Sequence, residues 1–249
     1  MLRILVQACH GCLDLVLPER CVLCDRQPGE EAVMLAAGAK VPGLRIWDRP
    51  QLCQSCWLTL QGECPRRVLR GEDGLVVSSV AGMVTDQRLV TLVGALKYHG
   101  LRGVAWPLAS LAARAMALVR KQKVDHLVAL PLHPARWRER GFNQAALLAW
   151  LLARECQADH RPELLRRWRR TGQQARLCSS FAVRFANVRH AFRAEPPPLT
   201  GGRRVGLVDD IITSGATILA AAEALTAAGW RVPWAVAVGM SASTAREDR

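Results

Sequence analysis

The sequence lacks any apolar stretch long enough to cross a bilayer, and it has no internal repeat or low-complexity tract. A membrane-spanning helix needs roughly 18 or more consecutive apolar residues, and no run in this chain reaches that length. The first apolar run, Ile4–Val6, is also too short for a secretory leader, and Asp14 interrupts the sequence soon after it. These absences argue against an integral membrane protein and against a repeat protein, and they predict a cytoplasmic location.

Acidic side chains are scarce, but only in one part of the chain. The sequence has 34 basic and 21 acidic residues and a formal net charge of +13. Residues 1–74 carry nine of each sign, so the whole excess lies in residues 75–249. Most of it falls between Arg161 and Arg193, where nine arginines meet the single acid Glu163. Such a surface suits polyanions, either a phosphorylated sugar or nucleic acid, although a merely solvated arginine-rich face stays open.

In a cytoplasmic protein, cysteines serve as metal ligands or core residues more often than as disulfides. Of the nine cysteines here, four form two Cys-x-x-Cys pairs, Cys21 with Cys24 and Cys53 with Cys56. Four thiolates fill a tetrahedral zinc shell and leave no position for a catalytic water. The pairs therefore predict one structural Zn²⁺ site, and a small domain with few large apolar side chains would gain its fold from that metal.

The other cysteines are less informative. Cys9 and Cys12 form a third pair, but they lie in an apolar pattern with helical spacing, which favours core or helix-face thiols. Cys64 has no partner three residues on and stays open as a replacement for one of the four ligands. Cys156 and Cys178 are expected to be ordinary core thiols.

Strand and helix patterns alternate after the cysteine-rich part. This alternation predicts an α/β fold with a parallel sheet flanked by helices, in which ligands bind at the carboxyl ends of the strands. We expect a small zinc-binding domain over residues 1–74 and an α/β domain over residues 75–249. The expected strands are 75–84, 124–132, 205–208 and 232–240, and the expected helices are 86–97, 104–119, 142–156 and one that follows residue 217, with a basic, irregular region before residue 194.

The richest stretch begins with the apolar run Val205–Val208, which ends in the adjacent acids Asp209 and Asp210. A small-residue loop follows and leads into a helical pattern. Hydroxyl side chains and free N–H groups at a helix start form a phosphate cradle, and a glycine there lets the backbone approach a ligand closely. The acids cannot bind phosphate, so they should bind sugar hydroxyls or a metal, and together the parts describe a ribose-5-phosphate site. The loop residues are Thr213, Ser214, Gly215, Ala216 and Thr217.

Two further groups of cations fit a phosphate ligand. Arg136, Arg138 and Arg140 follow the predicted strand 124–132, and we expect them in a loop. Guanidinium groups bind phosphate oxygens bidentately and keep their charge. Lys97 ends a predicted helix and could reach an anion as a point charge. Solvated surface cations remain the alternative for each.

The stretch Val205–Thr217 resembles the PRPP-binding motif of type I phosphoribosyltransferases. That resemblance implies that Asp209 and Asp210 hold the 2′- and 3′-hydroxyls of the ribose and that the loop wraps the 5′-phosphate. Nearly the whole chain resembles the ComF family of competence-associated, phosphoribosyltransferase-like proteins, including its GntX-type members. The shared features are the Cys-x-x-Cys pairs, LKYHG at residues 96–100 and RGFNQ at residues 140–144. In that family the RGFNQ loop lies where type I enzymes bind pyrophosphate, which implies this role for Arg136 and Arg140.

The resemblance implies displacement of pyrophosphate from C1 of PRPP by a nitrogen nucleophile, with Mg²⁺ bridging the pyrophosphate and the ribose diol. Asp209 and Asp210 would then be the catalytic acids as well. Three functions stay open: phosphoribosyl transfer to an unidentified acceptor, PRPP or nucleotide sensing without turnover, and DNA handling during competence. The last would involve single-stranded DNA and DNA-uptake proteins, with Trp168 available to stack on a base. No base-specificity element follows Trp230, so the acceptor stays unknown, as does the oligomeric state.

Overall fold

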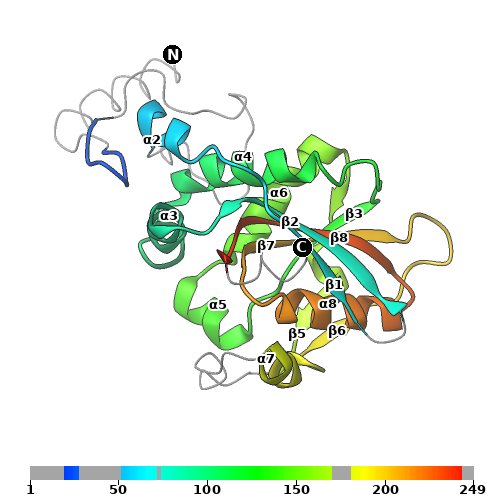
Figure 1. Ribbon diagram of the computed structural model, residues 1–249. Helices are drawn as coiled ribbons and strands as arrows, with labels where there is room; N and C mark the ends of the chain where they lie inside the picture. Colours follow the sequence, from blue (N-terminus) through cyan, green and yellow to red (C-terminus); the bar gives the residue numbers. More distant parts are fainter. Residues whose placement is uncertain (1–19, 28–51, 72–73, 170–180, 243–249) are drawn as a thin grey trace, which may run out of the picture.

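A six-stranded sheet runs through the centre of the protein (Figure 1). The computed structural model describes residues 20–27, 52–71, 74–169 and 181–242. From β2 to β4 every neighbouring pair is parallel, and only β1 pairs antiparallel, with β2. The expected α/β architecture with a mostly parallel sheet is thus confirmed. In spatial order the strands are β1 (Arg66–Arg70), β2 (Val76–Val84), β8 (Arg231–Met240), β7 (Arg204–Ile212), β3 (His126–Ala129) and β4 (Asp159–His160).

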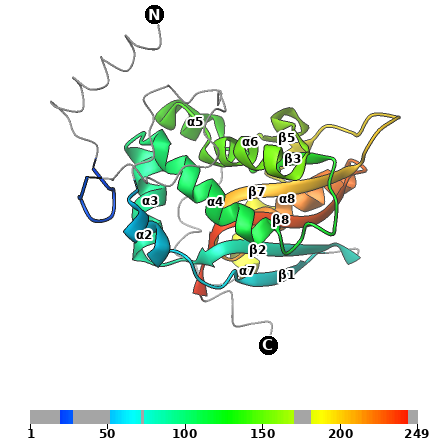
Figure 2. The same ribbon diagram turned by 90° about the horizontal axis from the view of Figure 1, so that it is seen from above.

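Helices cover both faces of this sheet (Figures 1 and 2). One core cluster joins one face to α3 (Gln87–Tyr98), α4 (Ala105–Met116) and α6 (Gln144–Cys156). A second cluster joins the other face to α8 (Ala216–Ala227) and to α7 (Phe181–Val188). Among the described residues, none of the helices combines the length and the apolar character that crossing a bilayer requires. The smaller elements are α2 (Gln54–Thr59), η2 (Arg102–Val104), α5 (Pro134–Arg140), η3 (Pro162–Leu164), β5 (Leu165–Arg167) and β6 (Phe192–Ala194).

Alternation of side chains along β8 explains the two layers. Trp234, Val236 and Val238 belong to the cluster under α4 and α6, whereas Ala235 and Ala237 belong to the cluster under α8. Successive side chains of a strand point to opposite faces, so one strand serves both cores. The small alanines leave room for α8, itself rich in buried alanine.

Two expectations for the strands and loops need correction. The predicted strand 124–132 is shorter, because β3 covers only His126–Ala129. Pro131 has no N–H group to continue the ladder, and the chain leaves the sheet there. The basic region expected to be irregular contains η3 and α7, and its β5 and β6 form a separate two-stranded antiparallel sheet.

The loop predicted to carry the three arginines is a helix, α5. His133 caps its start, where Nδ1 accepts a hydrogen bond from the Ala135 N–H at 3.2 Å. Pro134 occupies the first turn, where a missing N–H costs nothing. Gly141 ends the helix in the left-handed conformation, with a φ of 73°. Arg136, Arg138 and Arg140 therefore lie on a helix of seven residues, and the sequence carried the cap, the proline and the glycine that form it.

The cysteine-rich part packs against the sheet domain. Cys21, Leu52 and Leu60 are buried in the same core cluster as α3 and α4. Strand β1 lies before residue 74, yet its five residues pair with β2 in the central sheet. The polypeptide on the N-terminal side of the expected boundary thus contributes an edge strand to the sheet.

A close approach in the sheet makes a stability prediction. A Cβ at Gly206 would lie 2.5 Å from two ring atoms of Trp234, whose side chain is 2% exposed. Gly206→Ala should therefore lower the free energy of unfolding by about 1–3 kcal/mol, as overpacking does in cores. Gly94 in α3 is the matched control, because a Cβ there meets nothing within 4 Å. Gly94→Ala should instead raise stability by about 0.5–1 kcal/mol. Denaturant unfolding of both variants checks this, and equal shifts would contradict the packing described.

Candidate functional site

Four cysteine thiols meet in the N-terminal part of the structure. The Sγ atoms of Cys21, Cys24, Cys53 and Cys56 all lie within 4.8 Å of one another, and those of Cys24 and Cys53 are 3.7 Å apart. Tetrahedral thiolates with Zn–S bonds of about 2.3 Å lie about 3.8 Å from one another. The two pairs thus form a cluster that could hold a metal ion, and its donors and spacing fit zinc.

Short turns present these thiols. The Asp25 N–H donates to the Cys21 carbonyl at 2.8 Å, which closes the first turn. Cys53 precedes α2, and its carbonyl accepts from the Trp57 N–H at 3.0 Å. Burial opposes thiolate formation at Cys21, but hydrogen bonds from backbone N–H groups, that of Cys53 foremost, outweigh it and lower the pKa of Cys21 to about 7. A thiolate is the form that binds metal.

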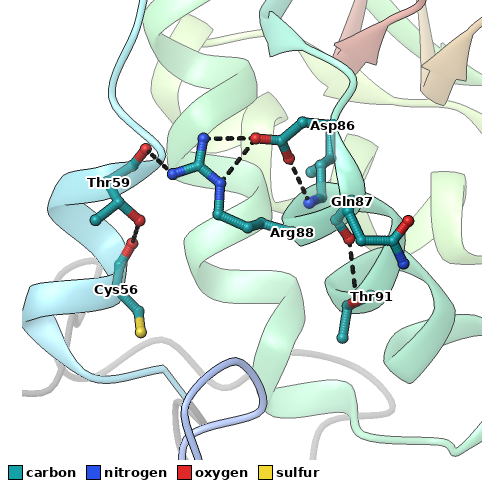
Figure 3. A network of polar contacts seen from close by, with 7 residues as sticks. Cys56, Thr59, Asp86, Gln87, Arg88 and Thr91 are labelled. Atoms are coloured by element: carbon teal, nitrogen blue, oxygen red, sulfur yellow. Dashed lines mark hydrogen bonds and ion pairs between the residues drawn. The ribbon is translucent and has the colours of Figure 1, made fainter.

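A network of hydrogen bonds joins α2, the helix that follows Cys53, to the start of α3 in the sheet domain (Figure 3). Arg88 at the start of α3 donates to the carbonyl of Thr59 at 2.6 Å, and its Nε donates to Asp86 at 2.7 Å. Asp86 also caps α3 by accepting from the Leu89 N–H at 3.0 Å. The Thr59 hydroxyl donates to the carbonyl of Cys56 at 2.7 Å. The C-terminal end of α2, the helix that bears Cys56, is therefore fixed to the start of α3.

The remaining cysteines lie outside the cluster or outside the described residues. Cys64 donates a weak hydrogen bond to the Gly82 carbonyl over 3.7 Å, so it is not one of the four clustered thiols. Cys156, the last residue of α6, is partly buried and packs against the core, as expected. The structure describes neither Cys9 nor Cys12 nor Cys178.

A second constellation lies at the carboxyl end of β7, in the middle of the sheet. Asp209 and Asp210 lie within this strand near its C-terminal end, since β7 continues through Ile212 beyond the expected 205–208, and the Asp210 side chain is 8% exposed. Its Oδ2 lies 2.6 Å from Nζ of Lys97 on α3 and accepts from Nε2 of Gln144 on α6 at 2.9 Å. Its Oδ1 accepts from the Ile211 N–H at 2.8 Å. The buried carboxylate is thus held by an ammonium, an amide and a backbone N–H.

The network continues to α5. Arg140 donates to Oε1 of Gln144 at 3.2 Å, and its guanidinium lies 5.1 Å from the ring centroid of Tyr98, the residue after Lys97. Arg140, Gln144, Asp210 and Lys97, four residues from four elements, thus form one connected group. From the sequence, Gln144 is expected only to lie in the helix 142–156 and not to belong to the site. Its place in RGFNQ, four residues after Arg140, was the available signal.

Asp209 has an unusual protonation equilibrium. Burial, and then the negative charge of Asp210, raise the pKa of Asp209 to about 8, and Lys97 opposes part of that rise. The Oδ1 atom of Asp209 accepts from the Asp210 N–H at 2.8 Å. A cation that binds beside Asp209 would oppose this rise and favour its ionised form.

The loop 213–217 follows directly. Gly215 precedes α8 in the left-handed conformation, with a φ of 78°. The first intrahelical bond runs from the Leu219 N–H to the Gly215 carbonyl at 2.9 Å, so the N–H groups of the first turn have no partner within the helix. Ser214 is buried, Thr217 half-buried and Thr213 exposed. This arrangement provides the helix start that anion binding uses.

Strand β1 contacts the loop 213–217 and supports it, a contact that the sequence did not predict. Arg67 donates to the carbonyl of Ser214 at 3.1 Å. A Cβ at Gly215 would lie 2.5 Å from a methyl group of Leu69. The close approach and the positive φ together explain why glycine occupies this position.

The fold and the two sites define a mixed α/β protein with a mostly parallel sheet and a four-cysteine cluster. No family model matches the chain. The DNA utilization protein YhgH of Escherichia coli K12 is 35% identical over 155 residues, which span 56% of this chain and just under two thirds, 66%, of that protein. YhgH of Salmonella typhimurium LT2 is 33% identical over 218 residues, 85% of this chain and 92% of that protein. The chain belongs to the family of these DNA utilization proteins.

A solved structure, that of TT1426 from Thermus thermophilus, is 18% identical and covers 57% of this chain and 83% of its own. Its TM-score of 0.29 is too low to establish a common fold.

The cysteine cluster makes a prediction about metal content. The purified chain should carry about one zinc ion, and Cys56→Ser should lose it, because a hydroxyl is a poor zinc ligand and three thiolates leave the shell open. Cys64→Ser is the matched control, since that thiol lies outside the cluster, and its zinc content should equal that of the parent. Metal analysis of the three proteins checks this. Zinc retained by Cys56→Ser and lost by Cys64→Ser would assign the site to other ligands.

Proposed function

We propose that the chain is a type I phosphoribosyltransferase-like protein of the ComF kind, which binds PRPP beyond the carboxyl end of β7 and transfers its phosphoribosyl group. One observation carries this proposal. The acid pair lies near the C-terminal end of β7, with only Ile211 and Ile212 between it and the loop 213–217 at the start of α8, and the Lys97 ammonium lies 2.6 Å from Asp210. Diol-binding acids, a phosphate-binding helix start and a cation are the three complements that PRPP requires.

In this proposal each part of PRPP has its own partners. The loop 213–217 binds the 5′-phosphate through first-turn N–H groups and hydroxyls. Asp209 and Asp210 accept hydrogen bonds from the ribose 2′- and 3′-hydroxyls, as charged acceptors do most strongly. Lys97, which contacts Asp210, and Arg140, which contacts Gln144, bind the pyrophosphate. Arg136, one turn before Arg140 on α5, joins them.

The donor set also agrees with a role for Mg²⁺. The Asp210 oxygens already accept hydrogen bonds from Lys97, Gln144 and a backbone N–H. The two acids alone therefore do not offer a complete set of free oxygen ligands for Mg²⁺. Mg²⁺ usually keeps waters and binds through one or two carboxylates plus substrate phosphates, so Asp209 and the pyrophosphate oxygens would hold it. When bound it supplies positive charge that neutralises the leaving pyrophosphate.

The reaction breaks the bond from C1 to the pyrophosphate oxygen and forms a bond from C1 to a nitrogen of the acceptor. The electron pair of the broken bond leaves with pyrophosphate, where Lys97, Arg136 and Arg140 stabilise the negative charge. The ribose ring becomes positively charged in the transition state, and the ionised acids stabilise it. A cation near Asp209 lowers its raised pKa, so Mg²⁺ bound together with PRPP would favour the ionised form of that acid.

The same site could bind PRPP without turnover, as a sensor. The two alternatives differ in one measurable product, because only the enzyme releases pyrophosphate when an acceptor base is added. In either case we propose that residues 1–74 form the zinc-binding part and residues 75–249 the phosphoribosyltransferase-like part. The zinc then anchors β1, the strand that supports the phosphate loop through Arg67.

Substitution of the acid pair, Asp209 and Asp210, tests the proposed PRPP binding. A charged hydrogen bond contributes about 1.5–3 kcal/mol, so Asp209→Asn combined with Asp210→Asn should weaken PRPP binding at least ~100-fold in the presence of Mg²⁺. Asp159→Asn is the matched control, since that carboxylate on β4 is 78% exposed, and it should bind like the parent. Equilibrium dialysis with labelled PRPP measures the affinities, and unfolding curves verify that the double variant is folded. A folded double variant with parental affinity would refute the assignment.

A second function, binding of single-stranded DNA, is favoured by a different surface. Arg166 on β5 and Arg193 on β6 lie directly opposite each other, and both are exposed. Like charges in such cross-strand pairs destabilise a sheet. Arg193 also lies 4.4 Å from the ring centroid of Trp168, which is 52% exposed. Two exposed guanidinium groups beside an exposed indole suit phosphates and a stacked base. The relatives' name, DNA utilization protein, agrees with this function.

Not every arginine of the basic segment between Arg161 and Arg193 lies on this surface. Arg167 is half-buried, with its guanidinium 5.4 Å from the ring of the buried Phe192, so it does not share the face of Arg166. Arg169 is exposed, and Arg170 lies outside the described residues.

The expected DNA affinity falls steeply with salt. Each phosphate neutralised on a single strand contributes a log–log slope of about −0.7, so reversing Arg166 and Arg193 to glutamate should make the slope less steep by about 1.4. Arg120→Glu combined with Lys121→Glu, two exposed cations after α4, changes the net charge by the same amount and should leave the slope unchanged. Fluorescence anisotropy with a labelled oligonucleotide at several salt concentrations measures both. Equal changes in the two variants would show that only net charge matters.

A further inference from the structure

A cavity of about 350 Å³ lies on the far side of the RGFNQ turn, between η2, α5, α6 and β4. Three aromatic side chains line it: Trp137 of α5, Phe142 of the turn and Trp150 of α6. Arg102 and His160 complete its polar lining, because the Asn143 amide is used by Leu130 and by the cap of α6. The cavity is therefore mainly aromatic, with one cation and one imidazole.

The two polar groups of the lining, Arg102 and His160, indicate which class of ligand the cavity could bind. The Arg102 guanidinium lies 4.9 Å from the ring centroid of Phe142, so a positive charge is held at the aromatic wall. Nε2 of His160 is buried and has no hydrogen-bond partner among the described residues. Burial lowers the pKa of His160, so the imidazole is neutral near pH 7 and can either accept or donate a hydrogen bond. A purely apolar ligand would leave Nε2 of His160 without a hydrogen-bond partner.

We propose that this cavity binds one nucleotide, with the base stacked on the aromatic side chains and the phosphate facing Arg102. Stacking on aromatic rings accommodates every base, and an arginine is the side chain best suited to phosphate. The volume lies at the lower end of the ~300–1,000 Å³ range of small-molecule sites, which suits a single nucleotide. The net charge of +13 favours an anionic ligand.

The cavity shares one turn with the acid network but uses other side chains. Gly141, Phe142 and Asn143 line the cavity, whereas Arg140 and Gln144 on either side of them join the network around Asp210. The nucleotide site is therefore distinct from the proposed PRPP site, and it does not require that proposal to be correct.

The experiment compares two similarly exposed tryptophans. Trp137 is 55% exposed and lines the cavity, while Trp168 is 52% exposed and lies beside Arg193. The full chain is titrated with dAMP in saturating ribose 5-phosphate, which keeps the ligand away from the proposed phosphate loop. Trp137→Ala should weaken dAMP binding at least ~10-fold, whereas Trp168→Ala should leave it unchanged. Arg102→Gln should weaken dAMP but not deoxyadenosine, which has no phosphate.

A second titration, with a short oligo(dA), distinguishes a free nucleotide from a nucleotide of a bound DNA strand as the ligand of the cavity. Weakening of dAMP by Trp137→Ala assigns a free-nucleotide site, and weakening of the oligonucleotide alone assigns a base of a bound strand; either supports the cavity as a nucleotide site. Deoxyribose 5-phosphate lacks a base and should bind at least tenfold more weakly than dAMP. Equal affinity of these two ligands, or no effect of Trp137→Ala on either base-bearing ligand, would overturn the proposal. PRPP affinity is measured separately on the parent chain, so a failure of the PRPP proposal stays distinguishable from a failure of this one.

Discussion

A buried carboxylate, that of Asp210, organises the centre of this protein. Removing a carboxylate from water is costly unless charges and hydrogen bonds replace the lost hydration. Lys97 from α3, Gln144 from α6 and the Ile211 N–H supply those partners, and each comes from a different stretch of the chain. The need to satisfy one carboxylate thus fixes two helices against the end of β7. It also positions Arg140, which reaches the same group through Gln144.

The cysteine cluster is physically linked to this centre, although the two lie far apart in sequence. α2, which bears Cys56, is fixed to α3 by Arg88 and Thr59 (Figure 3), and α3 ends in the turn that contains Lys97. The chain then continues from α2 into β1, which supports the loop before α8 through Arg67. Through α2, the cysteine cluster is thus connected to both a helix and a strand that border the proposed sugar-phosphate site. Loss of a metal ion bound by these thiols should therefore disturb that site without any direct contact between the two.

Local patterns in the sequence predict much of this architecture, because periodicity and cap residues act over a few positions. The parallel strands, the long helices and the four clustered cysteines all follow from such patterns. The loop predicted for the three arginines was wrong, because His133, Pro134 and Gly141 are the start and stop signals of the helix α5. Contacts between distant segments could not be read in this way: Gln144 with Asp210, Arg67 with the loop, and Arg166 opposite Arg193 depend on how the elements pack. The aromatic cavity depends on four separate elements for the same reason.

The central claim is that the acid pair, the loop and the neighbouring cations bind one phosphoribosyl ligand together. Calorimetric titration of the unmodified chain with PRPP, with and without Mg²⁺, tests it most directly when ribose 5-phosphate is titrated in parallel. The account predicts tight PRPP binding that needs Mg²⁺, and weaker ribose 5-phosphate binding that does not, because only PRPP carries the pyrophosphate. Absence of PRPP binding at any Mg²⁺ concentration, in a chain that retains its metal and its fold, would contradict it.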